Sequence, residues 1–155
     1  MSVLGVMIDG SGSDGAAIEH RLSQGWAHFF ERDRAFTGRR VPVRLRWKRF
    51  SETVLRTVLH GAGSWAPSLQ LADKLRVFEA KCLKIMLNYA DPDEADPVAV
   101  REFHIRLNVR LKHLKELFDW TSLADMHLNM HISWLGHVAR LPAASPLHLS
   151  YTFIL

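Results

Sequence analysis

The sequence predicts a mainly α-helical protein, an array of four to five amphipathic helices with one short N-terminal strand. Hydrophobic residues make up 48% of the 155 residues, which is enough to form one packed core. Apolar side chains recur at helical spacing in several stretches, and prolines and glycines separate these stretches. Because each helix must bury its apolar stripe, we expect the helices to pack against one another.

The N-terminal part predicts a strand, a loop and a helix. Residues 2–8 (SVLGVMI) are typical of a short buried strand, and the glycine, serine and aspartate residues that follow indicate a loop. Ser13 or Asp14 can then cap a helix that runs to about Phe36. The apolar positions of this helix are Ile18, Leu22, Trp26 and Phe29.

Two further helices begin at prolines, which fit a first helical turn because their missing N–H has no partner there. Pro42 starts the second helix, which Gly61 and Gly63 end, and Pro67 starts the third. The apolar stripe of the second helix consists of Trp47, Phe50, Val54 and Val58. The stripe of the third consists of Leu71, Leu75, Phe78, Cys82 and Ile85.

The acidic segment 91–97 (DPDEADP) predicts a loop and is the best candidate for an internal boundary. The fourth helix follows it, with an apolar stripe of Val100, Phe103, Leu107, Leu111, Leu114 and Phe118. Asp119 or Ser122 can cap the fifth helix. Its predicted stripe consists of Leu123, Met130, Trp134, Val138 and Leu141. Residues 142–155 form a tail in which LHLSYTFIL alternates like a strand.

The composition argues against several classes of protein. The one cysteine, Cys82, permits no intrachain disulfide, which fits a reducing intracellular compartment, and its place on an apolar stripe predicts a buried small side chain. No apolar run approaches the ~20 residues that span a bilayer, so we expect no membrane partner. His127 and His131 share a helix face, but the nine histidines form no zinc-binding sequence pattern. We therefore expect no metal ion or other cofactor in this chain.

Basic residues concentrate between Arg32 and Arg56, in a chain with a net charge of +4. At 100° per residue, the second helix places Arg46, Arg49 and Arg56 on one flank of its apolar stripe, and Arg44 and Lys48 on the other. Arginines along a helix suit phosphate contact, because the guanidinium binds phosphate through two parallel hydrogen bonds. The alternative is a solvated helix whose arginines extend their charged ends into water.

The stretch HISWLGHVARLP, residues 131–142, places a tryptophan, a glycine, a histidine and an arginine within two helical turns. We expect Trp134 and Val138 to pack together, and Gly136 to permit the close approach of another element or of a nucleic-acid backbone. His137 and Arg140 share a face and either contact phosphate or balance the negative end of the helix.

The order of these motifs resembles the C-terminal part of the reverse transcriptase, an RNA-directed DNA polymerase, of non-LTR (LINE-like) retrotransposons, from about Leu4 to Leu141. The stretch RWKRFSETVLRTVLHGAGSW is similar to the family's basic helix and Tyr-Gly-x-x-x-Trp turn, with His60 in place of the tyrosine. The stretch LRVFEAKCLKIML is similar to the next helix, and WLGHVARL to the late Trp/Phe-x-Gly-His-x-x-Arg motif, which is the most specific of these signals.

The resemblance implies a division of the chain around nucleic acid. Residues 1–13 would be the remnant of a palm strand and its loop, 14–90 a thumb-like helical domain, 91–97 an acidic loop, 98–141 a post-thumb helical region, and 142–155 a tail. The thumb would contact the backbone of an RNA/DNA template–primer duplex. The predicted nucleic-acid-binding residues are Arg39, Arg40, Arg44, Arg46, Lys48, Arg49, Arg56, His137 and Arg140.

The resemblance also implies what this chain does not do alone. Polymerases of the family hold Mg²⁺ with an Asp-Asp pair in the palm, and no Ala/Val-Asp-Asp sequence occurs here. We therefore expect no catalytic residue, and Mg²⁺ only in an intact polymerase. The chain would be a fragment of a transposable element that acts in the nucleus, with the missing palm and fingers as partners. The alternative is a stand-alone helical module that interacts with protein or nucleic acid.

Overall fold

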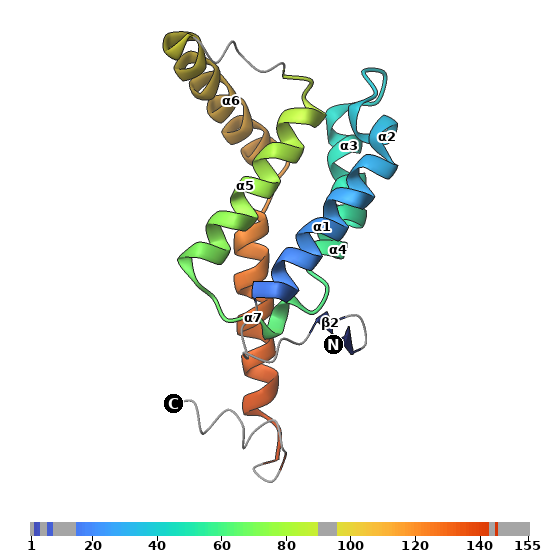
Figure 1. The fold of residues 1–155 in the computed structure, drawn as a ribbon, viewed down its shortest axis with the longest axis vertical. Helices are drawn as coiled ribbons and strands as arrows, with labels where there is room; N and C mark the ends of the chain where they lie inside the picture. Colours follow the sequence, from blue (N-terminus) through green and yellow to red (C-terminus); the bar gives the residue numbers. More distant parts are fainter. Residues whose placement is uncertain (1, 4–5, 8–14, 90–95, 143–144, 146–155) are drawn as a thin grey trace.

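The computed structural model describes residues 2–3, 6–7, 15–89, 96–142 and 145, and it confirms the mainly α-helical class (Figure 1). The first helices are α1 (Gly15–Glu31), α2 (Asp33–Thr37) and α3 (Val43–Phe50). A π-helical turn, η1 (Ser51–Leu55), joins α3 directly to α4 (Arg56–Val58), and a 3-10 turn, η2 (Ala62–Ser64), follows. The remaining helices are α5 (Leu69–Met86), α6 (Pro97–Leu117) and α7 (Leu123–Ala139).

The predicted helices correspond closely to these elements. The first one is in two pieces, α1 and α2, because the backbone of Arg32 leaves the helical conformation between them (φ −114°, ψ 23°). Ser122, rather than Asp119, caps α7, since its Oγ accepts a hydrogen bond from the backbone N–H of Asp125 at 3.2 Å. Ser13 and Asp14, the predicted caps of the first helix, lie outside the described residues.

The structure differs from the sequence prediction at two element boundaries. In place of one strand over residues 2–8, Ser2–Val3 and Val6–Met7 form two short strands, β1 and β2, that pair antiparallel with each other. A strand needs a partner for its backbone groups, and within the described residues these two strands find it in each other. Asp96 and Pro97, predicted as the end of the acidic loop, instead cap and begin α6. The rest of that loop and nearly all of the tail lie outside the described residues.

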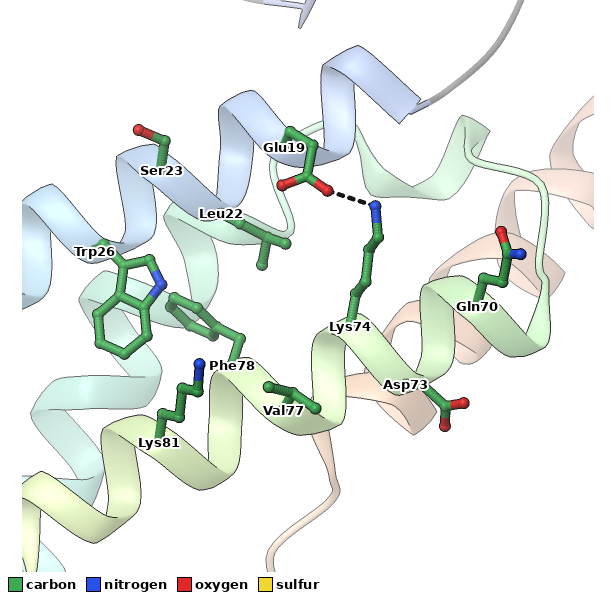
Figure 2. A pocket seen from close by; sticks show the side chains of 10 residues that line it. All are labelled: Glu19, Leu22, Ser23, Trp26, Gln70, Asp73, Lys74, Val77, Phe78 and Lys81. Carbon is green, nitrogen blue, oxygen red and sulfur yellow. Dashed lines mark hydrogen bonds and ion pairs between the residues drawn. The ribbon is translucent and has the colours of Figure 1, made fainter. Parts of the chain in front are cut away.

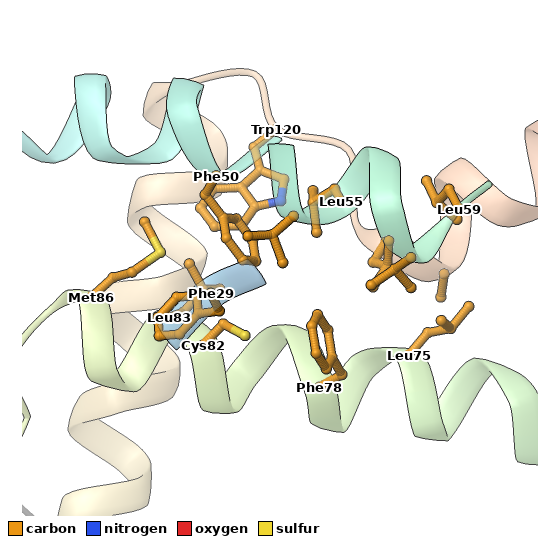
Figure 3. Packing of buried hydrophobic residues seen from close by; sticks show 14 of the residues in the cluster. Phe29, Phe50, Leu55, Leu59, Leu75, Phe78, Cys82, Leu83, Met86 and Trp120 are labelled. Carbon is orange, nitrogen blue, oxygen red and sulfur yellow. The ribbon is translucent and has the colours of Figure 1, made fainter. Parts of the chain in front are cut away.

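One apolar core joins helices from both halves of the chain (Figure 3). Phe29 of α1, Phe50 of α3 and Leu75 of α5 are fully buried in it, and Trp120 stacks on Trp47 from the connection between α6 and α7. Gly25 lies where α1 crosses α4 and α5, so that a Cβ atom at this position would collide with the Val58 side chain. The glycine therefore permits α1 to pack closely against α4 and α5, because it has no side chain at the crossing point.

Cys82 is part of the same core, as predicted from its place on the stripe of α5. Its side chain is fully buried, and burial together with the nearby charge of Glu79 raises the pKa of its thiol far above the usual range. Leu71, Leu75 and Phe78 of the predicted stripe are buried as well.

The predicted stripe of α7 is partly wrong. Met130 is 39% exposed, whereas His127 and His131 are buried at 3% and 8% exposure. The reason is that α7 packs on the η2 turn, where Nδ1 of His131 lies 2.9 Å from the carbonyl oxygen of Gly63 and the His127 ring lies 5.9 Å from that of Trp65. A hydrogen-bonded imidazole can be buried at a modest cost in free energy. The pattern of apolar residues alone therefore did not identify the buried face of α7.

Glu79 of α5 is a buried carboxylate, 2% exposed, that binds three groups from the second half of the chain. Its Oε1 accepts hydrogen bonds from the Trp120 Nε1–H at 3.0 Å and from the Leu123 backbone N–H at 3.1 Å. Its Oε2 accepts one from Nζ of Lys115 at 3.1 Å. The carboxylate thus attaches the end of α6 and the N-terminus of α7 to α5.

We expect Glu79→Gln to lower the free energy of unfolding by about 2–3 kcal/mol, because the amide nitrogen would face buried donors that then lack an acceptor. Urea unfolding followed by circular dichroism measures this loss. The matched control is Glu102→Gln on the exposed face of α6, which should change stability by less than about 0.5 kcal/mol. Equal stability of the two variants would contradict the role of Glu79.

Candidate nucleic-acid interface

The predicted nucleic-acid-binding residues lie in several separate places. Arg39 and Arg40 are exposed in the connection between α2 and α3. Arg44, Lys48 and Arg49 are exposed on α3. We call these five exposed residues, which are grouped by their place in the chain, the α3 basic surface, although Arg49 lies on a different flank of α3 from Arg44 and Lys48. His137 and Arg140 are exposed at the C-terminal end of α7, which lies at the opposite end of the molecule from α3 (Figure 1).

Arg46 is not part of this surface, and its prediction as a phosphate contact is wrong. The residue is only 7% exposed. Its Nε–H donates to the carbonyl oxygen of Val41 at 2.9 Å, and its Nη1 donates to that of Met86, the last residue of α5. The guanidinium therefore satisfies a carbonyl that the helix leaves without a partner and places positive charge at the negative end of α5.

A π-helical turn, η1, interrupts the predicted second helix. A π-helix bonds residue i to i+5, so the 100° step of an α-helix cannot be extended across Ser51–Leu55. Arg56, which follows η1, lines a groove beside α1, whereas Arg44 and Lys48 line a hollow beside Trp47 and Phe118, so these residues lie on different sides, as predicted. Of the flank predicted for Arg46, Arg49 and Arg56, the structure buries Arg46.

Arg56 lies in a groove of about 380 Å³ between α1 and the η1–α4 segment, which we call the α1–α4 groove. The residues that line it are Arg21, His28, Arg32, Glu52, Thr53, Arg56, Thr57 and His60. Of these, only Arg56 was assigned to a site from the sequence. Arg21, His28 and Arg32 stand seven and four residues apart, which is one face of a helix, so their alignment was visible in the sequence.

Positive charge dominates the α1–α4 groove, where the described lining residues include three arginines and one carboxylate, that of Glu52. Glu52 has a partner outside the groove, because Nζ of Lys48 lies 3.9 Å from its Oε1. The two threonine hydroxyls donate to their own helix, Thr53 to the carbonyl of Arg49 at 2.7 Å and Thr57 to that of Thr53 at 3.1 Å. The guanidinium groups of Arg32 and Arg56 and the imidazole groups are the donors that the groove can offer to a ligand.

A larger hollow of about 880 Å³ lies between α1 and α5 and has a different character (Figure 2). Leu22, Trp26 and Phe78 form its apolar wall, and an ion pair between Glu19 and Lys74 crosses it (Figure 2). The positive charge at this end of the hollow is thus already balanced by a carboxylate. This hollow is therefore less suited to bind an anion than the α1–α4 groove.

The stretch WLGHVAR contacts the rest of the molecule through the glycine of another segment. A Cβ atom at Gly63 would lie 3.3 Å from Cβ of Trp134 and 3.4 Å from the carbonyl oxygen of Met130, so Gly63 permits η2 to approach α7. At Gly136 the nearest such atom is Nη1 of Arg140, at 3.5 Å. The close approach of another element is therefore found at Gly63, and the approach of a nucleic-acid backbone at Gly136 stays a prediction. The two alternatives for His137 and Arg140 both stay predictions.

Comparison of the chain with protein-family models, with curated proteins and with solved structures found no match. Within the described residues, no three or more His, Cys, Asp or Glu side chains are grouped so that they could hold a metal ion. None of the described helices is both long and apolar enough to cross a membrane.

We expect Arg46→Gln to lower the free energy of unfolding by about 1–3 kcal/mol, because two carbonyl oxygens lose a charged donor. Urea unfolding tests this. In the control, Arg106→Gln on the exposed face of α6, stability should stay within about 0.5 kcal/mol of the wild type. The slope of log K against log salt for duplex binding should stay close to that of the wild type in both variants, since neither residue is then in contact with phosphate; a smaller slope for Arg46→Gln alone would restore its predicted contact with phosphate.

Proposed function

We propose that this chain is a thumb-like region of a non-LTR retrotransposon reverse transcriptase that binds the backbone of a template–primer duplex. The observation that carries the proposal is the α3 basic surface, on which five exposed cations gather within residues 39–49. Among the described residues, Lys48 is the member of this surface that forms an ion pair, and its partner is Glu52. Cations that protein carboxylates leave unbalanced are suited to replace the counterions of a phosphate backbone.

The sequence resemblance gives this surface its context. The basic helix of the resemblance, RWKRFSETVLRTVLHGAGSW (residues 46–65), forms the second part of α3 together with η1, α4 and η2, and it packs against the WLGH stretch through Gly63. Contacts of arginine and lysine with phosphate position a nucleic acid without reading its sequence. Binding should therefore be sensitive to salt and nearly indifferent to base sequence.

We expect the chain to bind duplex nucleic acid with a negative slope of log K against log salt. Arg40→Gln/Arg44→Gln/Arg49→Gln should reduce that slope by up to about 2.7 units, at about 0.9 per lost phosphate contact. Fluorescence anisotropy with a labelled RNA/DNA duplex at several salt concentrations measures the slope.

The matched control for this experiment removes the same charge elsewhere. Arg101, Arg106 and Arg110 are exposed on α6, and their replacement by glutamine lowers the net charge by the same three units. The slope should stay close to that of the wild type in this control. If both triple variants lose the same slope, binding depends on net charge alone, and the α3 basic surface is not the interface.

We also propose that the chain is not a polymerase on its own, since its sequence holds no Asp-Asp pair for two metal ions. The purified chain should incorporate no nucleotide on a primed RNA or DNA template with Mg²⁺ or Mn²⁺. Primer extension on a sequencing gel gives the readout. Template-dependent extension above the control without protein would refute this part of the proposal.

A second function, a stand-alone helical interaction module, is favoured by the outer face of α6. Val98, Ile105 and Val109 are exposed there at 66%, 52% and 64%, seven and four residues apart on one face of the helix. Such a face suits a protein partner. The two functions are separated by the duplex experiment, because a protein-binding module has no reason to show a salt slope that depends on the α3 basic surface.

A further inference from the structure

We propose that the α1–α4 groove seats one backbone phosphate of the bound nucleic acid, as a contact point separate from the α3 basic surface. This inference rests on the proposed function and adds a second site to it. Arg32, which directly follows α1, and Arg56, the first residue of α4, are distant in the sequence, and the packing of α1 on η1 and α4 brings them to one groove. A single phosphate between two guanidinium groups can receive hydrogen bonds from both.

The donors of the groove match the ligand. His28 and His60 add ring N–H groups to the arginines, and the hydroxyl hydrogens of Thr53 and Thr57 are already bonded to helix carbonyls. The groove therefore offers charged and imidazole donors, which phosphate oxygens accept. An apolar or cationic ligand would find few partners here.

The position of the groove allows it to act together with the α3 basic surface. Arg44 and Arg56 belong to one continuous helical segment, α3–η1–α4, and lie about 18 Å apart along its axis at 1.5 Å per residue. A B-form duplex rises 3.4 Å per base pair, so this axial distance corresponds to about five base pairs. The axial spacing of the two sites is therefore within the length of one bound duplex.

Arg32→Gln/Arg56→Gln tests the groove, with Arg101→Gln/Arg106→Gln on α6 as the control of equal charge. We expect the groove variant to reduce the slope of log K against log salt by up to about 1.8 units, and the control to leave it nearly unchanged. Equal slopes in the two variants would overturn the groove, while a slope that still depends on Arg40, Arg44 and Arg49 would leave the proposed function intact. Thermal unfolding confirms that both variants are folded.

A substitution at Glu52 tests the groove through an expected gain, rather than a loss, of duplex affinity. Glu52→Gln removes the one carboxylate of the groove, so it should raise duplex affinity. This gain should disappear in the Arg32→Gln/Arg56→Gln background if it acts through the groove. A gain that persists in that background acts through Lys48, the partner of Glu52 on the α3 basic surface, and would count against the groove.

The groove could take either an internal backbone phosphate or a terminal 5′-phosphate, and duplexes that differ at the 5′ end distinguish the two. Duplexes with a 5′-phosphate and with a 5′-hydroxyl should bind equally if the groove takes an internal backbone phosphate. A preference for the 5′-phosphate that is lost in the groove variant would overturn the backbone assignment in favour of a terminal phosphate. If the wild type binds no duplex, but inorganic phosphate shifts the NMR signals of His28 and His60 and not those of the groove variant, the proposed function fails and the groove stands as a phosphate site.

Discussion

The arrangement of the second half of this protein depends on one buried carboxylate, that of Glu79. A carboxylate in an apolar core is costly unless hydrogen-bond donors surround it, and here Lys115, Trp120 and the backbone of Leu123 supply them. The three donors come from the end of α6, the connection and the first residue of α7. Because α7 begins at this carboxylate, the position of its N-terminus on α5 depends on a single side chain. The stack of Trp47 on Trp120 then ties the same connection to α3.

Arginine has two opposite uses in this fold. Arg46 is buried and bonds the carbonyl oxygens of Val41 and Met86, so its charge serves the end of α5. Arg44 and Arg49, on the same helix, are exposed. The difference arises from what lies beside the helix at each position, since only Arg46 faces the carbonyl end of another helix. Net charge therefore overstates the positive charge that a partner of α3 meets.

Apolar spacing predicted the helices well, because each stripe must be buried whatever it packs against. Most of the stripe of α5, in which Ile85 is only partly buried, and most of the stripe of α6 were correct for this reason. The burial of His127 and His131 was missed, since it depends on the Gly63 carbonyl and on the ring of Trp65, which come from another segment. The α1–α4 groove was missed in the same way: the spacing of Arg21, His28 and Arg32 showed a basic face, but its position opposite Arg56 exists only after α1 packs on α4. The π-helical turn was not predicted, because the pattern of apolar residues gave no indication of it.

The burial of Cys82 gives the protein an internal reporter of its own opening. It is the one cysteine in the sequence, it lies in the C-terminal half of α5, and burial raises the pKa of its thiol. Alkylating reagents attack the thiolate, so the folded chain is protected against them twice, by exclusion of the reagent and by scarcity of the reactive form. Labelling must then pass through conformations in which α5 leaves the core. The rate of alkylation under native conditions therefore measures how often the helices separate, without an added probe or a change of sequence.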